Sequence, residues 1–206
     1  MKAVRIITGR AAPLDRSDVD TDQIIPASWL KRVERTGFGK GLFSTWRDND
    51  RDFVLNRPEY AGATILVAGP NFGTGSSREH AVWALTDYGF EAVVSSRFGD
   101  IFRNNSTKAG LVPVQVDEAV ARSLLEAVTR DPGLEVTIDL ERLKLEAPAA
   151  GIEASFPLDP FTQHRLLEGL DDIGLTLRFS GEIGEYEVSR PSYMPSVPAV
   201  PGSPYT

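Results

Sequence analysis

The chain has 206 residues, of which 41% are hydrophobic and 25% charged, and its formal net charge is −7. This length suits one well-buried domain, and the acidic balance argues against nucleic acid or an anionic membrane as a partner. No apolar run is long enough to span a membrane, and the N-terminal sequence MKAVRIITGR lacks the hydrophobic stretch of a signal peptide. We therefore expect a cytoplasmic protein.

The sequence contains no cysteine and only two histidines, His80 and His164. Without cysteine the chain cannot form a disulfide, supply a thiolate nucleophile, or ligate zinc or an iron–sulfur cluster through sulfur. Two histidines far apart in the sequence argue against a histidine-rich metal site, and we expect both to be ordinary helix residues. Metal or redox chemistry would have to come from another molecule.

The first predicted element is a strand at 3–7. A long functional loop region is expected at 15–60, with a short helix near 28–35. A short apolar run at 64–69 predicts a buried strand, and the spacing of apolar residues over 77–88 predicts a helix.

Apolar runs at 92–94 and 111–116 enclose a polar segment at 97–109, and 118–130 carries apolar residues at helical spacing. Strands that alternate with helices in this way predict a parallel sheet. Within the polar segment, residues 103–105 (Arg-Asn-Asn) follow an apolar strand, at the end where such sheets bind ligands.

The last third of the chain has a different pattern. Alternation of apolar and polar residues over 136–145 predicts an antiparallel strand pair with one wet face. Asp159-Pro160 is a favourable start for a helix that ends near Gly169. Short strands are expected at 176–179 and 185–188. The tail at 191–206 has five prolines in sixteen residues and is expected to be extended or disordered.

The segment at 73–80, Gly-Thr-Gly-Ser-Ser-Arg-Glu-His, predicts a glycine-rich turn before a helix. Ser76 and Glu79 have the spacing of a capping box. An arginine in the first helical turn opposes the helix dipole, so Arg78 is unfavourable there unless an anion lies beside it. Together with Ser77, these residues predict a binding site for a carboxylate or phosphate. The simpler alternative is a capped helix with no ligand.

Nucleotide binding is disfavoured at this turn. No Gly-Lys-Ser/Thr follows, which excludes a P-loop. Gly73 and Gly75 fit the start of a dinucleotide fingerprint, but Arg78 stands where its third glycine belongs.

Asp18-x-Asp20-x-Asp22 resembles the start of a calcium loop, but the next position is Gln23 and the distal glutamate is missing. Turn and cap roles are the simpler interpretation of these aspartates, and an active-site carboxylate is the alternative. Further along, a basic cluster of Lys31, Arg32 and Arg35 lies near Trp29 and Phe38. Such a cluster forms either a solvated helix face or a contact to a dianionic substrate.

Two motifs carry a resemblance to a known family. The segment at 73–80 is similar to the signature of the swivelling domain of the aconitase superfamily, and Asp-Thr-Asp-Gln-Ile-Ile-Pro at 20–26 matches the second active-site motif of that domain. Segments at 30–39, 41–47 and 167–176 resemble one branch, the bacterial small subunits of isopropylmalate dehydratase. The resemblance covers about residues 4–190.

This resemblance implies an α/β fold of three layers, β/β/α, with a central parallel sheet and an added antiparallel sheet. It implies one swivelling domain at 1–190, followed by the tail. It also implies a heterodimer in which a large subunit holds a four-iron four-sulfur cluster on three cysteines. A chain without cysteine is compatible with that division, and no cofactor is expected on this chain.

The reaction implied is dehydration and rehydration of isopropylmalate, a small dicarboxylate, in leucine biosynthesis. By the same resemblance, Ser76 is the catalytic base, acting as an alkoxide, and Asp22 is the catalytic aspartate that orients a neighbouring group. The resemblance and the loop composition give these substrate-binding candidates: Gly75, Ser77, Arg78, Leu30, Arg32, Val33 and Arg35. Whether Arg32 or Arg35 reaches the substrate stays open; Leu30, Val33 and Trp29 are placed to contact the apolar branch of the substrate.

Other functions remain compatible with the sequence. The small subunit of a homoaconitase or of a methylmalate or citraconate hydratase would share the fold and the serine-arginine site. A different class, a non-catalytic anion-binding or assembly module, would bind a dicarboxylate or a partner without turnover.

Overall fold

The computed structural model describes residues 1–31, 36–191, 193 and 194. They form two compact units, one ending at Asp171 and the other beginning at Asp172. This boundary falls inside the range 1–190 that the sequence assigns to a single domain. No helix among the described residues is long and apolar enough to cross a membrane.

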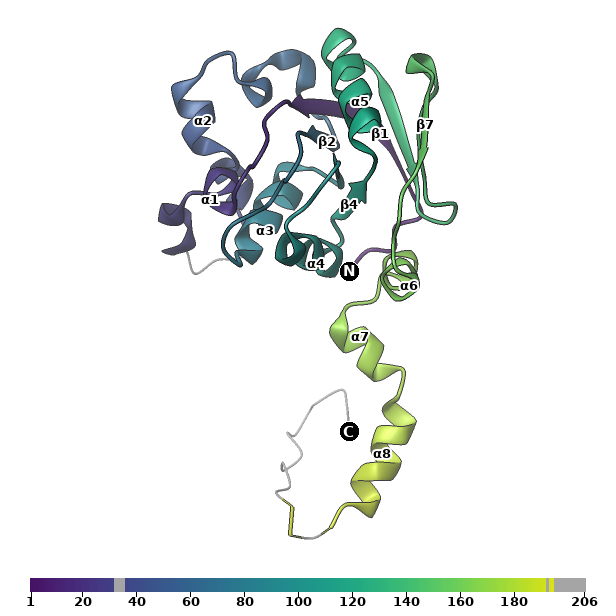
Figure 1. The fold of residues 1–206 in the computed structure, drawn as a ribbon. Helices are drawn as coiled ribbons and strands as arrows, with labels where there is room; N and C mark the ends of the chain where they lie inside the picture. The colour runs from purple at the N-terminus through teal and green to yellow at the C-terminus, as the bar shows by residue number, and fades with distance from the viewer. Residues whose placement is uncertain (32–35, 192, 195–206) are drawn as a thin grey trace. The chain divides into compact units, whose positions relative to one another are not determined.

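The described part of the first unit contains one seven-stranded sheet in the order β4-β3-β2-β1-β5-β6-β7 (Figure 1). Its strands are β1 (Ile6–Leu14), β2 (Ile65–Ala68), β3 (Ala92–Ser95), β4 (Val112–Gln115), β5 (Glu135–Asp139), β6 (Lys144–Ala147) and β7 (Ile152–Ser155). Strands β1 to β4 pair in parallel, and β5 to β7 continue from β1 as antiparallel strands.

Strand β1 joins the two parts of the sheet. Residues 6–10 pair antiparallel with β5, whereas residues 11–14 pair in parallel with β2. The α/β class, the central parallel sheet and the added antiparallel strands are thus confirmed. The first strand, however, begins at Ile6 rather than at residue 3 and extends seven residues beyond the predicted end at residue 7.

Helices connect and cover the parallel strands. They are α3 (Glu79–Tyr88), α4 (Asp100–Ala109) and α5 (Glu118–Arg130). Every residue of β2 and β3 is buried, as expected for strands covered on both faces. Because β2, β3 and β4 are added in one direction, right-handed crossovers place α3 and α4 on one face of the sheet, where they contact each other. Helix α5 packs across β1, β2 and β3.

The polar segment at 97–109 contains helix α4, which the sequence analysis did not predict. Phe102 and Ser106 are its buried residues, and they lie four positions apart on one face. A helix with so few apolar positions has a weak periodic signal, which explains the omission.

The region at 15–60 consists of short helices rather than one long loop. They are α1 (Thr21–Ile24), the 3-10 helices η1 (Ala27–Lys31), η2 (Phe38–Gly41), η3 (Val54–Asn56) and η4 (Pro58–Tyr60), and α2 (Ser44–Asn49). The predicted helix near 28–35 corresponds to η1; residues 32–35 lie outside the described part of the chain. Buried aromatic side chains of Phe38, Phe43 and Phe53 fix this region to the core.

Helix α6 (Pro160–Glu168) begins and ends as predicted. The Asp159 carboxylate accepts hydrogen bonds from the backbone N–H groups of Phe161 and Thr162, at 3.0 and 3.1 Å. The Thr162 side chain first, and then these two N–H groups, lower the pKa of Asp159 below its usual value. Gly169 ends the helix with φ +66°, a conformation that glycine adopts without strain.

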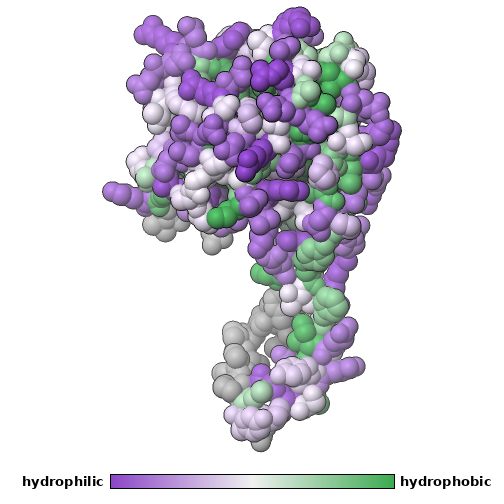
Figure 2. Space-filling model, viewed as in Figure 1, coloured by the Kyte–Doolittle hydropathy of each residue, from purple (hydrophilic) through white to green (hydrophobic). Residues whose placement is uncertain are grey.

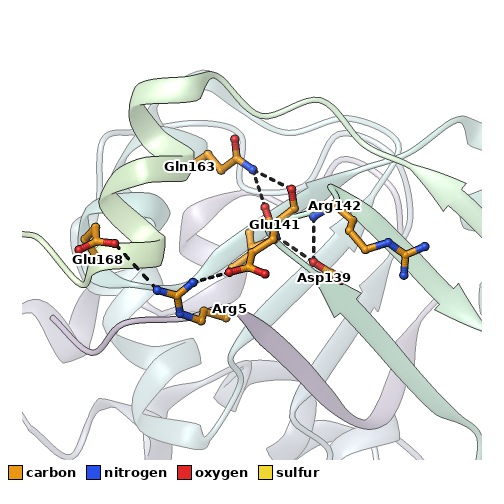
Figure 3. A network of polar contacts seen from close by, with 7 residues as sticks. Arg5, Asp139, Glu141, Arg142, Gln163 and Glu168 are labelled. Carbon is orange, nitrogen blue, oxygen red and sulfur yellow. Dashed lines mark hydrogen bonds and ion pairs between the residues drawn. The ribbon is translucent and has the colours of Figure 1, made fainter.

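Polar contacts join α6 to the β5–β6 turn and to the start of β1 (Figure 3). The Gln163 side chain donates to the backbone oxygen of Leu140 at 2.6 Å. Arg5 pairs with Glu141 and lies 4.0 Å from Glu168. All three charged side chains are substantially exposed, so these pairs add little stability.

The described residues of the second unit form α7 (Asp172–Leu177) and α8 (Ser180–Ser189), none of them buried. The strands predicted at 176–179 and 185–188 are therefore wrong. Alternation of polar and apolar residues over only four positions does not distinguish a strand from a helix. Apolar side chains are exposed here (Figure 2), among them Ile173, Leu177, Phe179, Tyr186 and Val188. The predicted tail at 191–206 falls almost entirely outside the described residues.

Candidate active site

The two sequence motifs lie side by side. The backbone oxygen of Val19 accepts hydrogen bonds from the N–H groups of Gly73, at 2.8 Å, and Thr74, at 3.1 Å. One residue on, Asp20 and Thr74 form a parallel bridge, and the N–H of Thr21 donates to the oxygen of Thr74 at 3.0 Å. The motif at 20–26 is thus hydrogen-bonded to the motif at 73–80, although some 50 residues separate them.

Gly73 and Gly75 form the tight turn that the sequence predicts, and both have a left-handed backbone conformation. Gly73 has φ +75°, and a Cβ atom there would lie 2.3 Å from Cγ of Phe102. Gly75 has φ +83°, and its Cβ would lie 3.3 Å from Cβ of Asp20. Any other residue would be strained at both positions, and at Gly73 it would also clash with an aromatic ring.

The predicted capping box of Ser76 and Glu79 is wrong. Helix α3 begins at Glu79, its N-cap residue is Arg78, and no side chain caps it. Ser76 lies in the preceding turn, where its backbone oxygen accepts a hydrogen bond from the N–H of Arg78 at 2.9 Å. The left-handed conformation of Gly75 directs the chain into this turn, so the spacing of the two side chains does not produce a cap.

A capping box does exist nearby, in α1. The Asp20 carboxylate accepts from the N–H of Gln23 at 2.8 Å, and the N–H of Asp20 donates to the Gln23 side chain at 2.9 Å. The simpler interpretation, a cap, is therefore correct for Asp20.

The turn before α3 presents unused donors. In the described part of the chain, the backbone N–H groups of Ser76, Ser77, Glu79 and His80 donate no hydrogen bond, whereas that of Arg78 is used within the turn. Ser76 and Ser77 are exposed. Free N–H groups at a helix N-terminus favour an anion.

The anion beside Arg78 is a carboxylate of the chain itself, and the predicted carboxylate or phosphate ligand stays a prediction. The Arg78 guanidinium forms an ion pair with Asp22. The Arg78 side chain is 20% exposed and that of Asp22 is 54% exposed, so the arginine is largely buried and its carboxylate partner faces solvent. An arginine held next to a protein carboxylate has the environment and the fork of donors to bind a carboxylate ligand.

The three aspartates of the calcium-like motif have separate partners. Asp18 accepts a hydrogen bond from the side chain of Asn71 at 2.6 Å, Asp20 caps α1, and Asp22 pairs with Arg78. Among the described residues, no group of three or more metal-ligating His, Cys, Asp or Glu side chains occurs.

Thr21 is the residue that the sequence analysis missed. Its side chain is buried, its hydroxyl donates to the backbone oxygen of Ser76 at 3.0 Å, and the two hydroxyl oxygens lie 3.4 Å apart. Its position between Asp20 and Asp22, inside the motif at 20–26, could have identified it as a site residue.

The predicted substrate loop is described only in part. Leu30 lies in η1 and is half-buried. Trp29 packs over Gly41, since a Cβ at that glycine would lie 2.5 Å from the indole ring. Predictions for Arg32, Val33 and Arg35 concern residues that the structure does not describe. Phe38 is buried against His80, with ring centroids 5.4 Å apart, so it faces α3.

Arg103 lies in α4, the helix that follows β3. With Asp159, Thr162 and neighbouring residues, it lines a cavity of about 340 Å³ between α4 and the start of α6. The cavity is lined by residues from 100–107 and 158–162, none of which belongs to the two motifs.

Comparison with known proteins gives a consistent result. Residues 1–119 match the family model of the aconitase C-terminal domain. The chain is 60% identical over 196 residues to a "3-isopropylmalate dehydratase small subunit" from Frankia alni, covering 95% of this chain and 99% of the relative. It is 56% identical to the protein of the same name from Rubrobacter xylanophilus, covering 96% of this chain and 100% of the relative.

A solved structure has the same fold. The crystal structure of a 3-isopropylmalate dehydratase from Methanocaldococcus jannaschii superposes with a TM-score of 0.64 at 27% sequence identity. The match covers 87% of this chain and 99% of that one.

Proposed function

Because the chain belongs to the aconitase C-terminal domain family and, within it, to the 3-isopropylmalate dehydratase small subunits, we propose that it interconverts 2-isopropylmalate and 3-isopropylmalate together with a large subunit. The observation that carries this proposal is the contact between the two motifs, which brings Thr21 and Asp22 against Ser76 and Arg78.

The large subunit is the natural place for the iron–sulfur cluster. This chain has no cysteine, so its residues do not fit a cluster ligated by three cysteines. The contribution of this chain is therefore to bind the dicarboxylate and to move a proton.

Ser76 is the proposed base. As an alkoxide, it takes a proton from a carbon next to a substrate carboxylate; the electrons of that C–H bond form the alkene as the C–O bond to the departing hydroxide breaks. In the second half of the reaction, hydroxide adds to the carbon that lost the proton. The proton held by Ser76 passes to the carbon that lost the hydroxide, which restores the alkoxide. Ser76 lies in the turn just before α3, so the unused N–H groups of the turn and the positive end of the helix would stabilise the alkoxide.

Arg78 is the proposed carboxylate clamp. Asp22 holds the guanidinium in the free chain, and a substrate carboxylate takes over part of that contact when it binds. Asp22 then keeps the guanidinium oriented, and the hydroxyl of Ser77 and the backbone at Gly75 complete the carboxylate site.

Substrate choice is assigned to the segment that contains Leu30 and Val33. Isopropylmalate carries an apolar branch, which these side chains would contact. Arg32 or Arg35 would bind the second carboxylate.

The test is anaerobic reconstitution of this chain with a large subunit carrying its cluster. Isopropylmalate, homoaconitate and citraconate are assayed side by side, with each subunit alone as the control. We expect turnover of isopropylmalate by the pair and by neither subunit alone. Preferential turnover of homoaconitate or citraconate would contradict the substrate assignment. A stable pair that binds a dicarboxylate but turns over none of the three would identify a non-catalytic module.

A further inference from the structure

Thr21 is fixed between the two motifs at both its backbone and its side chain. Its N–H donates to the oxygen of Thr74 at 3.0 Å, and its hydroxyl donates to the oxygen of Ser76 at 3.0 Å. The residue is 2% exposed, so water does not compete for its hydroxyl. The partners of this buried hydroxyl are the backbone oxygen and the hydroxyl of Ser76.

The number of protons on the Thr21 hydroxyl determines whether it donates or accepts in its second contact, the one with the Ser76 hydroxyl. A threonine hydroxyl has one proton to donate and two lone pairs. While that proton is donated to the oxygen of Ser76, the contact of 3.4 Å between the two hydroxyl oxygens can only be one in which Ser76 donates to Thr21. In the resting state Thr21 therefore accepts weakly from the proposed base.

The direction of the hydrogen bond between the two hydroxyls reverses when Ser76 loses its proton. An alkoxide is a much stronger acceptor than a backbone carbonyl, and hydrogen bonds to a charged group are shorter and stronger than neutral ones. Rotation about the Cβ–Oγ1 bond of Thr21 would redirect its proton from the Ser76 carbonyl to the Ser76 oxyanion. From 3.4 Å, the serine oxygen would have to approach by about 0.7–0.9 Å to reach the ~2.5–2.7 Å that is usual for a hydrogen bond to an oxyanion.

We propose that Thr21 is a positioning residue for Ser76, whose hydroxyl turns from the Ser76 carbonyl to the Ser76 alkoxide and so lowers the pKa of the base. The proposal rests on the proposed function, because it needs Ser76 to act as an alkoxide. It assigns to the middle residue of Asp20-Thr21-Asp22 a role distinct from those of the flanking aspartates, which cap α1 and pair with Arg78.

The test compares Thr21→Val, which keeps the branched shape and removes the hydroxyl, with Thr21→Ser, which keeps the hydroxyl. Each is assembled with the large subunit, and kcat, KM and the pH dependence of kcat are measured with isopropylmalate. We expect Thr21→Val to lower kcat by roughly 10- to 100-fold, the usual effect of losing a hydrogen bond to a charged group, with KM near that of the wild type. Because the alkoxide loses a donor, the rise of kcat with pH should move to higher pH. Thr21→Ser should restore kcat to within a few-fold of wild type.

An unchanged kcat and pH profile for Thr21→Val would overturn the proposal. Equal losses in Thr21→Val and Thr21→Ser, with no shift of the pH profile, would also overturn it, because they would show a packing role. If Thr21→Val does not assemble, Thr21→Ala removes the same hydroxyl and takes its place in the comparison. Ser76→Ala is measured in parallel: normal turnover in that variant would refute the proposed base itself, whereas a large loss there with a normal Thr21→Val would refute only the role of Thr21.

Discussion

At the scale of single residues, the position of Arg78 was more informative than the spacing of Ser76 and Glu79. A positive charge at a helix N-terminus is unfavourable unless an anion lies beside it, and in the structure the Asp22 carboxylate pairs with Arg78. The S-x-x-E spacing predicted a cap that does not form, because the turn at Gly75 places Ser76 before the helix. The contact between Thr21 and Ser76 could not be predicted from local patterns, since 55 residues separate the two.

Replacement of Arg78 by lysine tests the clamp at this scale. Arg78→Lys keeps the positive charge but loses the planar fork, so one hydrogen bond to the substrate carboxylate is lost. We expect KM for isopropylmalate to rise by roughly tenfold or more, the equivalent of about 1.4 kcal/mol or above. The matched control is Arg122→Lys on the exposed face of α5, which should leave the kinetics unchanged. Equal KM values for the two variants would show that Arg78 does not bind substrate through a fork.

At the scale of elements, periodic patterns predicted the segments whose packing is strongest. Helix α5 matches the predicted range 118–130, and the caps Asp159 and Gly169 set the ends of α6. Apolar periodicity did not predict the helices that bury few side chains. Helix α4 buries two of its ten residues, and α7 and α8 bury none, so neither region has a clear apolar face.

The turn between β2 and α3 gives a stability prediction. Gly73→Ala places a Cβ 2.3 Å from the Phe102 ring at a left-handed backbone position, whereas Gly151→Ala is left-handed too but has no atom within 4 Å of its Cβ. The backbone strain alone costs about 1–2 kcal/mol in each variant. We expect Gly73→Ala to lower the free energy of unfolding by more than Gly151→Ala does, measured by denaturant titration. A smaller loss at Gly73 would show that the turn relaxes without affecting the packing of α4.

At the scale of the whole molecule, alternating apolar runs predicted the parallel strands, and period-two alternation predicted the antiparallel ones. That both belong to one sheet was not predictable, because it depends on β1 changing partners between residues 10 and 11. The pairing of the two active-site motifs was expected only through the family resemblance. The structure gives its physical basis in the hydrogen bonds of Val19 and Thr21 to the glycine-rich turn.

The dependence on a second chain also belongs to this scale. An exposed serine and a half-exposed ion pair do not form an enclosed catalytic cavity by themselves, and the sequence lacks the cysteines for a cluster. The relatives of this chain are named small subunits, which implies a large subunit as its partner. Under the proposed function, this chain presents one side of an active site that the large subunit completes.

The most direct test of this account is the turnover of isopropylmalate by the reconstituted pair that carries Ser76→Ala. A positioned general base contributes about 10²- to 10⁴-fold to a rate, so we expect kcat to fall by that factor while the two subunits still co-purify. Ser123→Ala, an exposed serine on α5, is the control and should retain wild-type turnover. Turnover by Ser76→Ala within a few-fold of the control would contradict the assignment of Ser76 as the base.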